Sequence, residues 1–255
     1  MQAAELSTRL DDILETDAYA DADASANGLQ VGPADAQVER VAVAVDAATA
    51  TIDAAASEDV DMLVTHHGLS WGGIERLTGT TYARVAALVN AGMALYVSHL
   101  PLDGHPVHGN AAGLADLLDL DDRDPFGAVG GTYAGRQGRL PEPVSLDRLA
   151  DRLTTELDIG DGHVRTLAFG PDQVQDVAIL TGSGTDWLNE AVDAGADLLL
   201  TGEGKGQVYH EARELEINVI LAGHYATETF GVRSLAGLLE DWGLETTVIE
   251  CPTGL

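Results

Sequence analysis

The chain has 255 residues, of which 45% are hydrophobic, enough to form a core in one compact unit or two small domains. Its 42 acidic residues against 13 basic ones give a net charge of −29, and Lys205 is the only lysine. Because proteins bind phosphate backbones mainly through Lys and Arg, this charge argues against nucleic-acid binding. A scattered acidic excess with abundant Ala and Gly is typical of adaptation to high salt.

The sequence also indicates in which cellular compartment the protein lies and what its single cysteine can do. No run of about 18 apolar residues predicts a transmembrane helix. The segment Met1–Glu5 lacks the basic and apolar regions of a signal peptide, so we expect a cytoplasmic protein without a membrane partner. Cys251 is the only cysteine, which rules out an intramolecular disulfide and a thiolate metal cluster. No histidine lies near it in sequence, which argues against a nucleophilic role.

The first half of the chain predicts a helix followed by a strand–helix–strand unit. The helix covers Ala3–Leu14, and the acidic, small-residue segment Asp11–Ala26 is expected to be a solvated loop. Short apolar runs predict strands at Val41–Val45 and Asp61–Thr65. Thr49 stands where the N-cap of the intervening helix is expected.

The same pattern recurs in the second half of the chain. Residues 41–68 align without a gap with residues 177–204, and eight of the 28 positions are identical. The second copy predicts strands at Val177–Leu180 and Asp197–Thr201, with Thr185 at the matching N-cap position. Two strand–helix–strand units rich in Ala and Leu could look alike by chance, but the ungapped register favours an internal duplication.

We therefore predict an α/β fold with two similar three-layer lobes. The first lobe covers residues 1–125 and the second covers 126–255, with a C-terminal segment that could pack back on the first lobe. Residues 120–143 contain the Gly, Pro and Asp residues of a connector. A further helix is predicted over Leu146–Leu157.

Each copy continues through a further helix and strand, and these strands end at His99 and at His224, each followed after three residues by a carboxylate. Histidines and carboxylates therefore follow four predicted strands, where α/β sheets place their ligands. They are His66, His67, His99, Asp103, Glu203, His224 and Glu228. Neighbouring side chains at a strand end diverge, so the adjacent histidines can serve two different ions. A carboxylate after His-x3 can bridge two cations, as a two-metal centre requires.

Each of these motifs alone is a weak signal. An adjacent histidine pair is often only a surface pair, and His224 could be a core histidine whose hydrogen bonds are satisfied. Their matched positions in the repeat make a metal site the better interpretation. Four further histidines have no counterpart in the other copy, and solvated or supporting roles are expected for them; they are His105, His108, His163 and His210. Lys205 lies near Glu203 in a glycine-rich loop that lacks the spacing of a P-loop. The position of the only lysine next to a candidate metal motif points to contact with a substrate phosphate.

The ordered motifs resemble the NGG-interacting-factor-three-like family, whose members are often labelled GTP cyclohydrolase 1 type 2 homologues. They are Asn27–Gly32, Thr65-His66-His67, His99-x3-Asp103, Gly109-Asn110, Thr201-Gly-Glu203 and Gly223-His224-Tyr225-x-Thr227-Glu228. The resemblance covers about residues 5 to 250. The chain departs from the family pattern at Ser25-Ala26 and at Gly68, where Trp-Asp and Pro are common, and it lacks the domain inserted in longer relatives.

The resemblance implies a dinuclear metal centre between the two lobes and a toroidal homohexamer. Its ligands would be His66, His67, Asp103, His224 and Glu228, with Glu228 as the bridge. Two divalent ions per chain are expected, and zinc, iron, manganese and nickel all suit these ligands.

Two functions remain open at this point. In the first, the chain is a metal-dependent hydrolase in which His99 or Glu203 moves the proton and Lys205 meets a phosphorylated small molecule. The family label points to opening of the guanine ring of GTP. In the second, the hexamer is a non-catalytic assembly that handles metal or regulates another protein.

Overall fold

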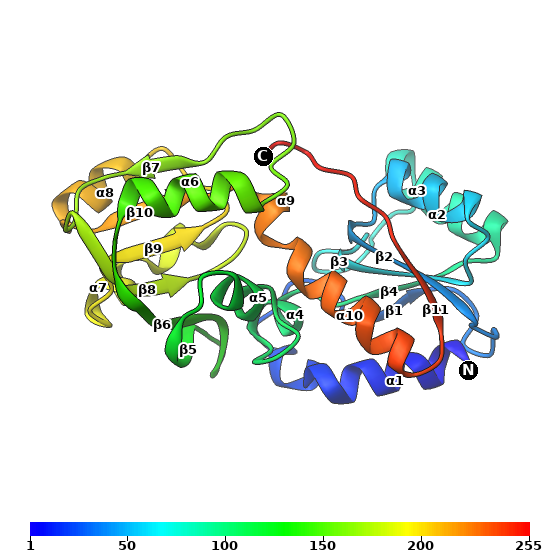
Figure 1. Cartoon of the computed structure of the whole chain (residues 1–255). Coiled ribbons are helices and arrows are strands. Elements are labelled where there is room, and N and C mark those ends of the chain that lie inside the picture. The colour runs from blue at the N-terminus through cyan, green and yellow to red at the C-terminus, as the bar shows by residue number, and fades with distance from the viewer. The chain divides into compact units, whose positions relative to one another are not determined.

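The computed structural model describes residues 1–255 and divides into two compact α/β units, each with its own sheet (Figure 1). Unit 1 comprises Met1–Leu102 and Gly231–Cys251, and unit 2 comprises Asp103–Phe230 and Pro252–Leu255. The boundaries fall within helix α4 (Leu100–Gly104), within the first turn of helix α10 (Thr229–Asp241) and after Cys251. Nowhere does the structure contain a helix with the length and apolar character that a membrane crossing requires.

Unit 1 is built on a mainly parallel sheet. Its elements are α1 (Ala3–Leu14), η1 (Thr16–Tyr19), β1 (Gly28–Val31), β2 (Arg40–Asp46), α2 (Thr49–Ser57), β3 (Met62–His67), α3 (Gly79–Ala91), β4 (Ala94–Val97) and β11 (Glu245–Val248). The five strands lie in the order β1-β4-β3-β2-β11, with only β1 antiparallel to its neighbour. The C-terminal ends of β2, β3 and β4 therefore meet at one edge of the sheet.

Alternate residues of the unit 1 strands point into two buried layers. Leu95 packs in one cluster with Ile52 of α2 and Leu88 of α3. The next residue, Tyr96, is fully buried, and its hydroxyl donates to Asp11 of α1 at 2.9 Å. Helices thus cover both faces of this sheet, which explains why its strands are apolar throughout rather than alternating.

Unit 2 is built on a mixed sheet. Its elements are α5 (Asn110–Leu117), β5 (Asp121–Val129), β6 (Thr132–Ser145), α6 (Leu146–Glu156), β7 (Arg165–Leu167), β8 (Gln173–Ile179), η2 (Gly184–Trp187), α7 (Leu188–Asp193), β9 (Leu198–Thr201), α8 (Val208–Glu214), β10 (Asn218–Leu221) and α9 (His224–Thr227). The six strands lie in the order β5-β6-β8-β9-β10-β7. The strands β8, β9 and β10 are parallel, and the outer ones are antiparallel to their neighbours.

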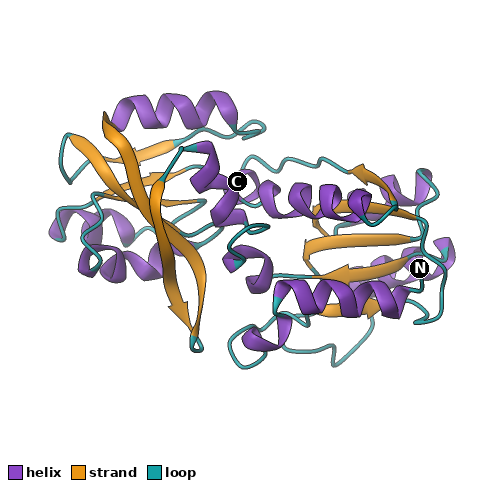
Figure 2. Cartoon of the chain, turned by 60° about the horizontal axis from the view of Figure 1, so that its bottom comes forward, coloured by secondary structure: helices purple, strands orange, loops and turns teal.

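The core of unit 2 lies between its sheet and its helices. Leu198 and Leu200 pack in one cluster with Leu149 of α6 and Leu114 of α5. Leu199, between them, is also fully buried and points to the opposite face of the strand. Figure 2 shows the strands of each unit with helices packed beside them.

The regular elements predicted from the sequence are confirmed. The first helix covers Ala3–Leu14 as predicted, and α6 ends within one residue of its predicted end. Strands β2, β3, β8 and β9 each overlap the run of apolar residues that predicted them. In each unit the central strands follow one another in parallel through helical crossovers.

Three local predictions were wrong. The segment Asp11–Ala26 is not a solvated loop, because its first residues end α1, Thr16–Tyr19 form η1 and the Asp23 side chain is 1% exposed. Residues 120–143 are not a connector but most of the β5–β6 hairpin; the outer strand β5 is largely exposed, and an edge strand tolerates aspartates and Pro125. Thr49 is the first residue of α2 rather than its N-cap. The cap is Ala48, whose backbone N–H donates to the Thr51 hydroxyl at 2.9 Å, and Thr185 lies inside η2.

Candidate metal-binding residues

Three histidines of unit 1 gather at the C-terminal edge of its sheet. His66 and His67 end β3, and His99 follows the neighbouring parallel strand β4. The ring centroid of His66 lies 4.6 Å from that of His67 and 5.1 Å from that of His99. One ligand atom from each ring lies within 4.8 Å of the other two, close enough to surround a metal ion.

Each of these rings is held through its Nδ1 atom by an oxygen acceptor. The pairs are His66 with the backbone carbonyl of Ser98 at 3.0 Å, His67 with Asp46 at 2.9 Å and His99 with Asp23 at 2.8 Å. An oxygen that accepts from Nδ1 keeps the proton there and leaves the Nε2 lone pair of the neutral ring for another partner. Metal-binding histidines are oriented in this way.

Asp23 was missed in the sequence, because its segment was expected to be a solvated loop. Its side chain is 1% exposed, and its two oxygens accept from His99, Asn27 and the backbone N–H groups of Ser25 and Leu100. Burial alone would raise the pKa of this carboxyl, but the hydrogen bonds and the nearby His99 outweigh it and lower the pKa to about 2. Asp23 therefore stays ionised and fixes His99.

Asp46 was missed as well, although the sequence carried a signal for it. It is the last residue of β2, the same strand-end position that drew attention to the histidines. Nothing in its spacing from His67 reveals the pairing, because the two residues meet through the β2–β3 register rather than along the chain.

The second set of predicted ligands lies in unit 2. His224 begins the short helix α9 after β10, and α9 brings its Nε2 within 3.2 Å of Glu228, four residues on. Its Nδ1 lies 3.1 Å from Glu203, which follows β9. The Asp103 carboxylate accepts from the side chains of Asn110 at 2.9 Å and Thr181 at 2.8 Å.

The carboxylates of Asp103 and Glu228 form the acidic part of this set. Their ligand atoms lie within 4.8 Å of each other, and both side chains are buried. Two ionised carboxylates this close repel each other where water is excluded, and a divalent cation between them removes that cost. The donor set of imidazole nitrogens and carboxylate oxygens therefore fits a borderline divalent ion.

Two carboxylates control the protonation of His224. Burial lowers its pKa, but the carboxylates of Glu228 and Glu203 outweigh burial and raise it to about 9. Because the folded pKa lies above the ordinary value, protonated His224 stabilises the metal-free fold below about pH 6.5, and this contribution is lost as the pH rises through 9.

Metal binding at His224 should therefore compete with this proton. We expect the apparent affinity of the metal-free protein for Mn²⁺ to rise roughly tenfold per pH unit between pH 7 and 9. Mn²⁺ titrations at pH 7, 8 and 9 measure this slope. Glu203→Gln should flatten it, because one of the two carboxylates that hold the proton is removed. A flat slope in the wild-type protein would contradict the assignment.

Gly182 makes room for the Glu228 carboxylate. It follows Thr181 with φ +60°, and a Cβ atom built there would lie 2.2 Å from Glu228 Oε1. We expect Gly182→Ala to displace Glu228 and to weaken metal binding roughly tenfold or more. Gly195→Ala is the matched control, since Gly195 also has a positive φ (+79°) but has nothing within 4 Å of its Cβ position. Equal metal affinity in the two variants would show that Glu228 does not need this space.

The remaining predicted residues lie outside these two groups of contacts. Lys205 is 57% exposed, and its ammonium pairs with Asp186 at 2.8 Å. The rings of His105 and His108 stack with centroids 5.0 Å apart, and burial lowers the pKa of His108. His163 and His210 are exposed.

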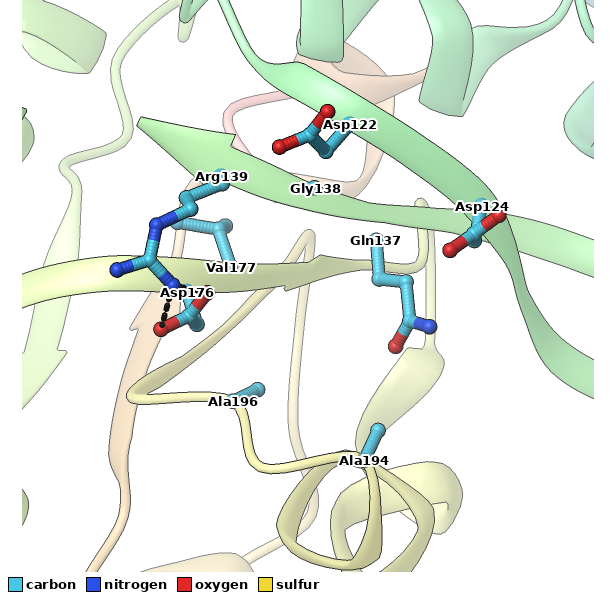
Figure 3. A pocket seen from close by; sticks show the side chains of 9 residues that line it. All are labelled: Asp122, Asp124, Gln137, Gly138, Arg139, Asp176, Val177, Ala194 and Ala196. Carbon is cyan, nitrogen blue, oxygen red and sulfur yellow. Dashed lines mark hydrogen bonds and ion pairs between the residues drawn. The ribbon is translucent and has the colours of Figure 1, made fainter. Parts of the chain in front are cut away.

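A separate depression of about 280 Å³ lies on unit 2 and is drawn in Figure 3. Its lining residues are Asp122, Asp124, Gln137, Gly138, Arg139, Asp176, Val177, Ala194 and Ala196. Arg139 pairs with Asp176 at 2.8 Å across it. The β8 residues that line this depression lie before the C-terminal end of the strand, whereas Thr181 and Gly182, which adjoin Asp103 and Glu228, follow that end. No predicted site residue lines the depression.

The fold and the ligand groups together define an α/β protein with a candidate histidine–carboxylate metal site. The sequence model of the family described as Duf34/NIF3 (NGG1p interacting factor 3) matches residues 1–253, and the chain belongs to this family. This confirms the resemblance seen in the sequence.

Named relatives match the whole chain. It is 54% identical over 255 residues to a GTP cyclohydrolase 1 type 2 homolog of Halobacterium salinarum, covering 100% of both chains. The crystal structure of TTHA1606 from Thermus thermophilus is similar with a TM-score of 0.89 and 41% identity, again over 100% of both chains. A structure titled protein ybgI, of unknown function, has a TM-score of 0.91 at 32% identity and the same coverage.

Proposed function

We propose that the chain binds two divalent metal ions through His66, His67, Asp103, His224 and Glu228 and that it is a metal-dependent hydrolase. The observation that carries the metal proposal is the anchoring of the three ligand histidines through Nδ1, His66 to the Ser98 carbonyl, His67 to Asp46 and His224 to Glu203. Such anchoring leaves Nε2 as the ligand atom. The family resemblance implies that both ligand sets serve one centre, with Glu228 as the bridge.

Two bound cations would lower the pKa of a shared water and stabilise charge on the group under attack. The protein would supply the proton transfer. His99, held by the ionised Asp23, is the proposed general base, in the way that a buried carboxylate orients a catalytic histidine. The sequence suggested Glu203 as a second candidate for the proton transfer. Because Glu203 holds the His224 ring through Nδ1, we also assign it a positioning role.

The proposed substrate is a phosphorylated small molecule, and the names of the relatives point to ring opening of GTP with release of formate. Lys205 is the proposed phosphate contact; it would have to exchange its pairing with Asp186 for the substrate. A homohexamer is the proposed assembly, as the family resemblance implies.

The alternative is a non-catalytic assembly that stores, delivers or senses metal. The breadth of the donor set supports it, because imidazole and carboxylate ligands suit several exchangeable divalent ions. A filled coordination shell would favour this alternative, whereas an open position for water would favour hydrolysis.

Turnover by the metal-loaded protein separates the two functions. Untagged wild-type protein loaded with Mn²⁺ or Zn²⁺ is incubated with GTP and with a set of phosphoesters, and formate and phosphate release are measured. We expect release that His99→Gln abolishes while metal content is retained. The control is His163→Gln, which replaces an exposed histidine. Full metal content without turnover on any substrate would favour the non-catalytic assembly.

A further inference from the structure

Trp71 stands beside the histidines of unit 1 with half of its side chain exposed. Its indole ring meets the ring of His99 edge to face, with centroids 4.8 Å apart, and its centroid lies 6.0 Å from that of His67. Trp71 nevertheless remains 50% exposed. An aromatic surface is thus open to solvent next to the rings of His99, the proposed general base, and His67, a proposed metal ligand.

The backbone around Trp71 is held firmly. The N–H of Leu69 donates to Gln30 Oε1 at 2.9 Å, the Ser70 carbonyl accepts from Ala26 at 3.2 Å, and the Gly72 N–H donates to the Ala24 carbonyl at 2.6 Å. Residue 71 itself forms an antiparallel bridge with residue 25. The exposed indole is therefore carried on a fixed loop rather than a free one.

The residue after the histidine pair is part of this arrangement. A Cβ atom at Gly68 would lie 2.5 Å from Gln30 Nε2, so glycine lets the Gln30 amide approach and bond to Leu69. The partners of this loop, Ala24, Ala26 and Gln30, lie in the same segment as Asp23, which fixes His99. The positions of Trp71 and His99 are therefore set by the same short stretch of chain.

The sequence segment that carries Trp71 has few acidic residues for this protein. Residues 68–91 contain one acidic residue, Glu75, and two arginines, although the whole chain has 42 acidic residues and a net charge of −29. An anionic ligand approaching the indole would meet less repulsion from this segment than from most of the chain.

We propose that Trp71 is a substrate-binding residue that stacks on the planar heteroaromatic ring of a phosphorylated substrate of purine-like size. The indole offers the apolar face that such a ring needs, and the fixed loop reduces the entropy lost on stacking. This deepens the proposed function, on which it rests, by naming the part of the substrate that unit 1 holds beside its histidines.

Binding of guanosine 5′-monophosphate and of ribose 5-phosphate to the metal-loaded protein tests this proposal, with isothermal titration as the measurement. We expect Trp71→Ala to weaken guanosine 5′-monophosphate binding roughly 10- to 100-fold, and Trp71→Phe to restore most of it. Ribose 5-phosphate lacks the ring, so its affinity should not change. Leu77→Ala, at an exposed leucine that follows in the same sequence segment, is the matched control and should bind like the wild type.

Two results would overturn the stacking proposal. One is an unchanged affinity of Trp71→Ala for guanosine 5′-monophosphate with metal content intact. The other is a change of oligomeric state in Trp71→Ala, measured by sedimentation, without selective loss of the ring-containing ligand; the indole would then contact a second copy. Failure of the proposed function is distinguishable, since it would appear as missing metal in the wild-type protein or as full metal content without turnover.

Discussion

Replacing Glu228 with alanine is expected to remove both metal ions from the chain and to abolish any metal-dependent turnover. Glu228 is 2% exposed, contacts His224 Nε2 at 3.2 Å and lies within 4.8 Å of Asp103. If it bridges the two ions, neither is held without it, whereas loss of a terminal ligand would weaken one ion first. Elemental analysis of the purified variant measures the metal content, and the turnover screen measures the activity.

Two further variants serve as comparisons for the metal content of Glu228→Ala. Glu214→Ala removes an exposed carboxylate of unit 2 and should keep the wild-type metal content. His67→Ala removes a terminal ligand and should keep more metal than Glu228→Ala. If Glu228→Ala retained about one ion per chain, as a terminal-ligand variant would, the bridging role would have to be abandoned.

Asp23→Asn is expected to cause the largest loss of stability, about 2–4 kcal/mol in the free energy of unfolding at pH 7. The asparagine retains only one oxygen for the four donors that the two Asp23 oxygens now serve. The variant should also lose activity, because His99 is no longer held. Chemical denaturation measures the stability, and metal analysis checks that the ligands remain in place.

The stability difference between Asp23→Asn and the wild type should depend on pH. The folded pKa of Asp23 is about 2 against an ordinary value of 3.8, so its ionised form stabilises the fold above about pH 4, and this contribution, on the order of 2 kcal/mol, is lost as the pH falls toward 2. The gap between the two proteins should therefore shrink between pH 5 and pH 2.5. Asp21→Asn, at a neighbouring exposed aspartate, should show no such gap. A gap that stays constant with pH would contradict the role of the Asp23 charge.

The apolar periodicity predicted the regular part of the fold because burial on both faces of a sheet leaves a strong signal. Val41–Val45 reads as a strand since every one of its side chains is buried in β2. The β5–β6 hairpin escaped prediction because β5 is an exposed edge strand, where Asp and Pro cost little. Local composition could not distinguish such a strand from a connector.

The candidate ligands could be predicted because ligand chemistry restricts their residue types and strand ends restrict their places. Their supports could not be predicted in the same way. Asp23 acts on His99 across 76 positions of sequence, and no spacing rule connects the two. Gly182 matters through the space that it leaves for Glu228, a property that only the three-dimensional packing reveals.

The proposed two-ion centre is tested most directly by the metal content of untagged wild-type protein, measured by elemental analysis before and after incubation with Mn²⁺ or Zn²⁺. We expect about two transition-metal ions per chain. A protein that holds none after incubation would contradict it, and the anchored histidines and buried carboxylates would then need a purely structural explanation.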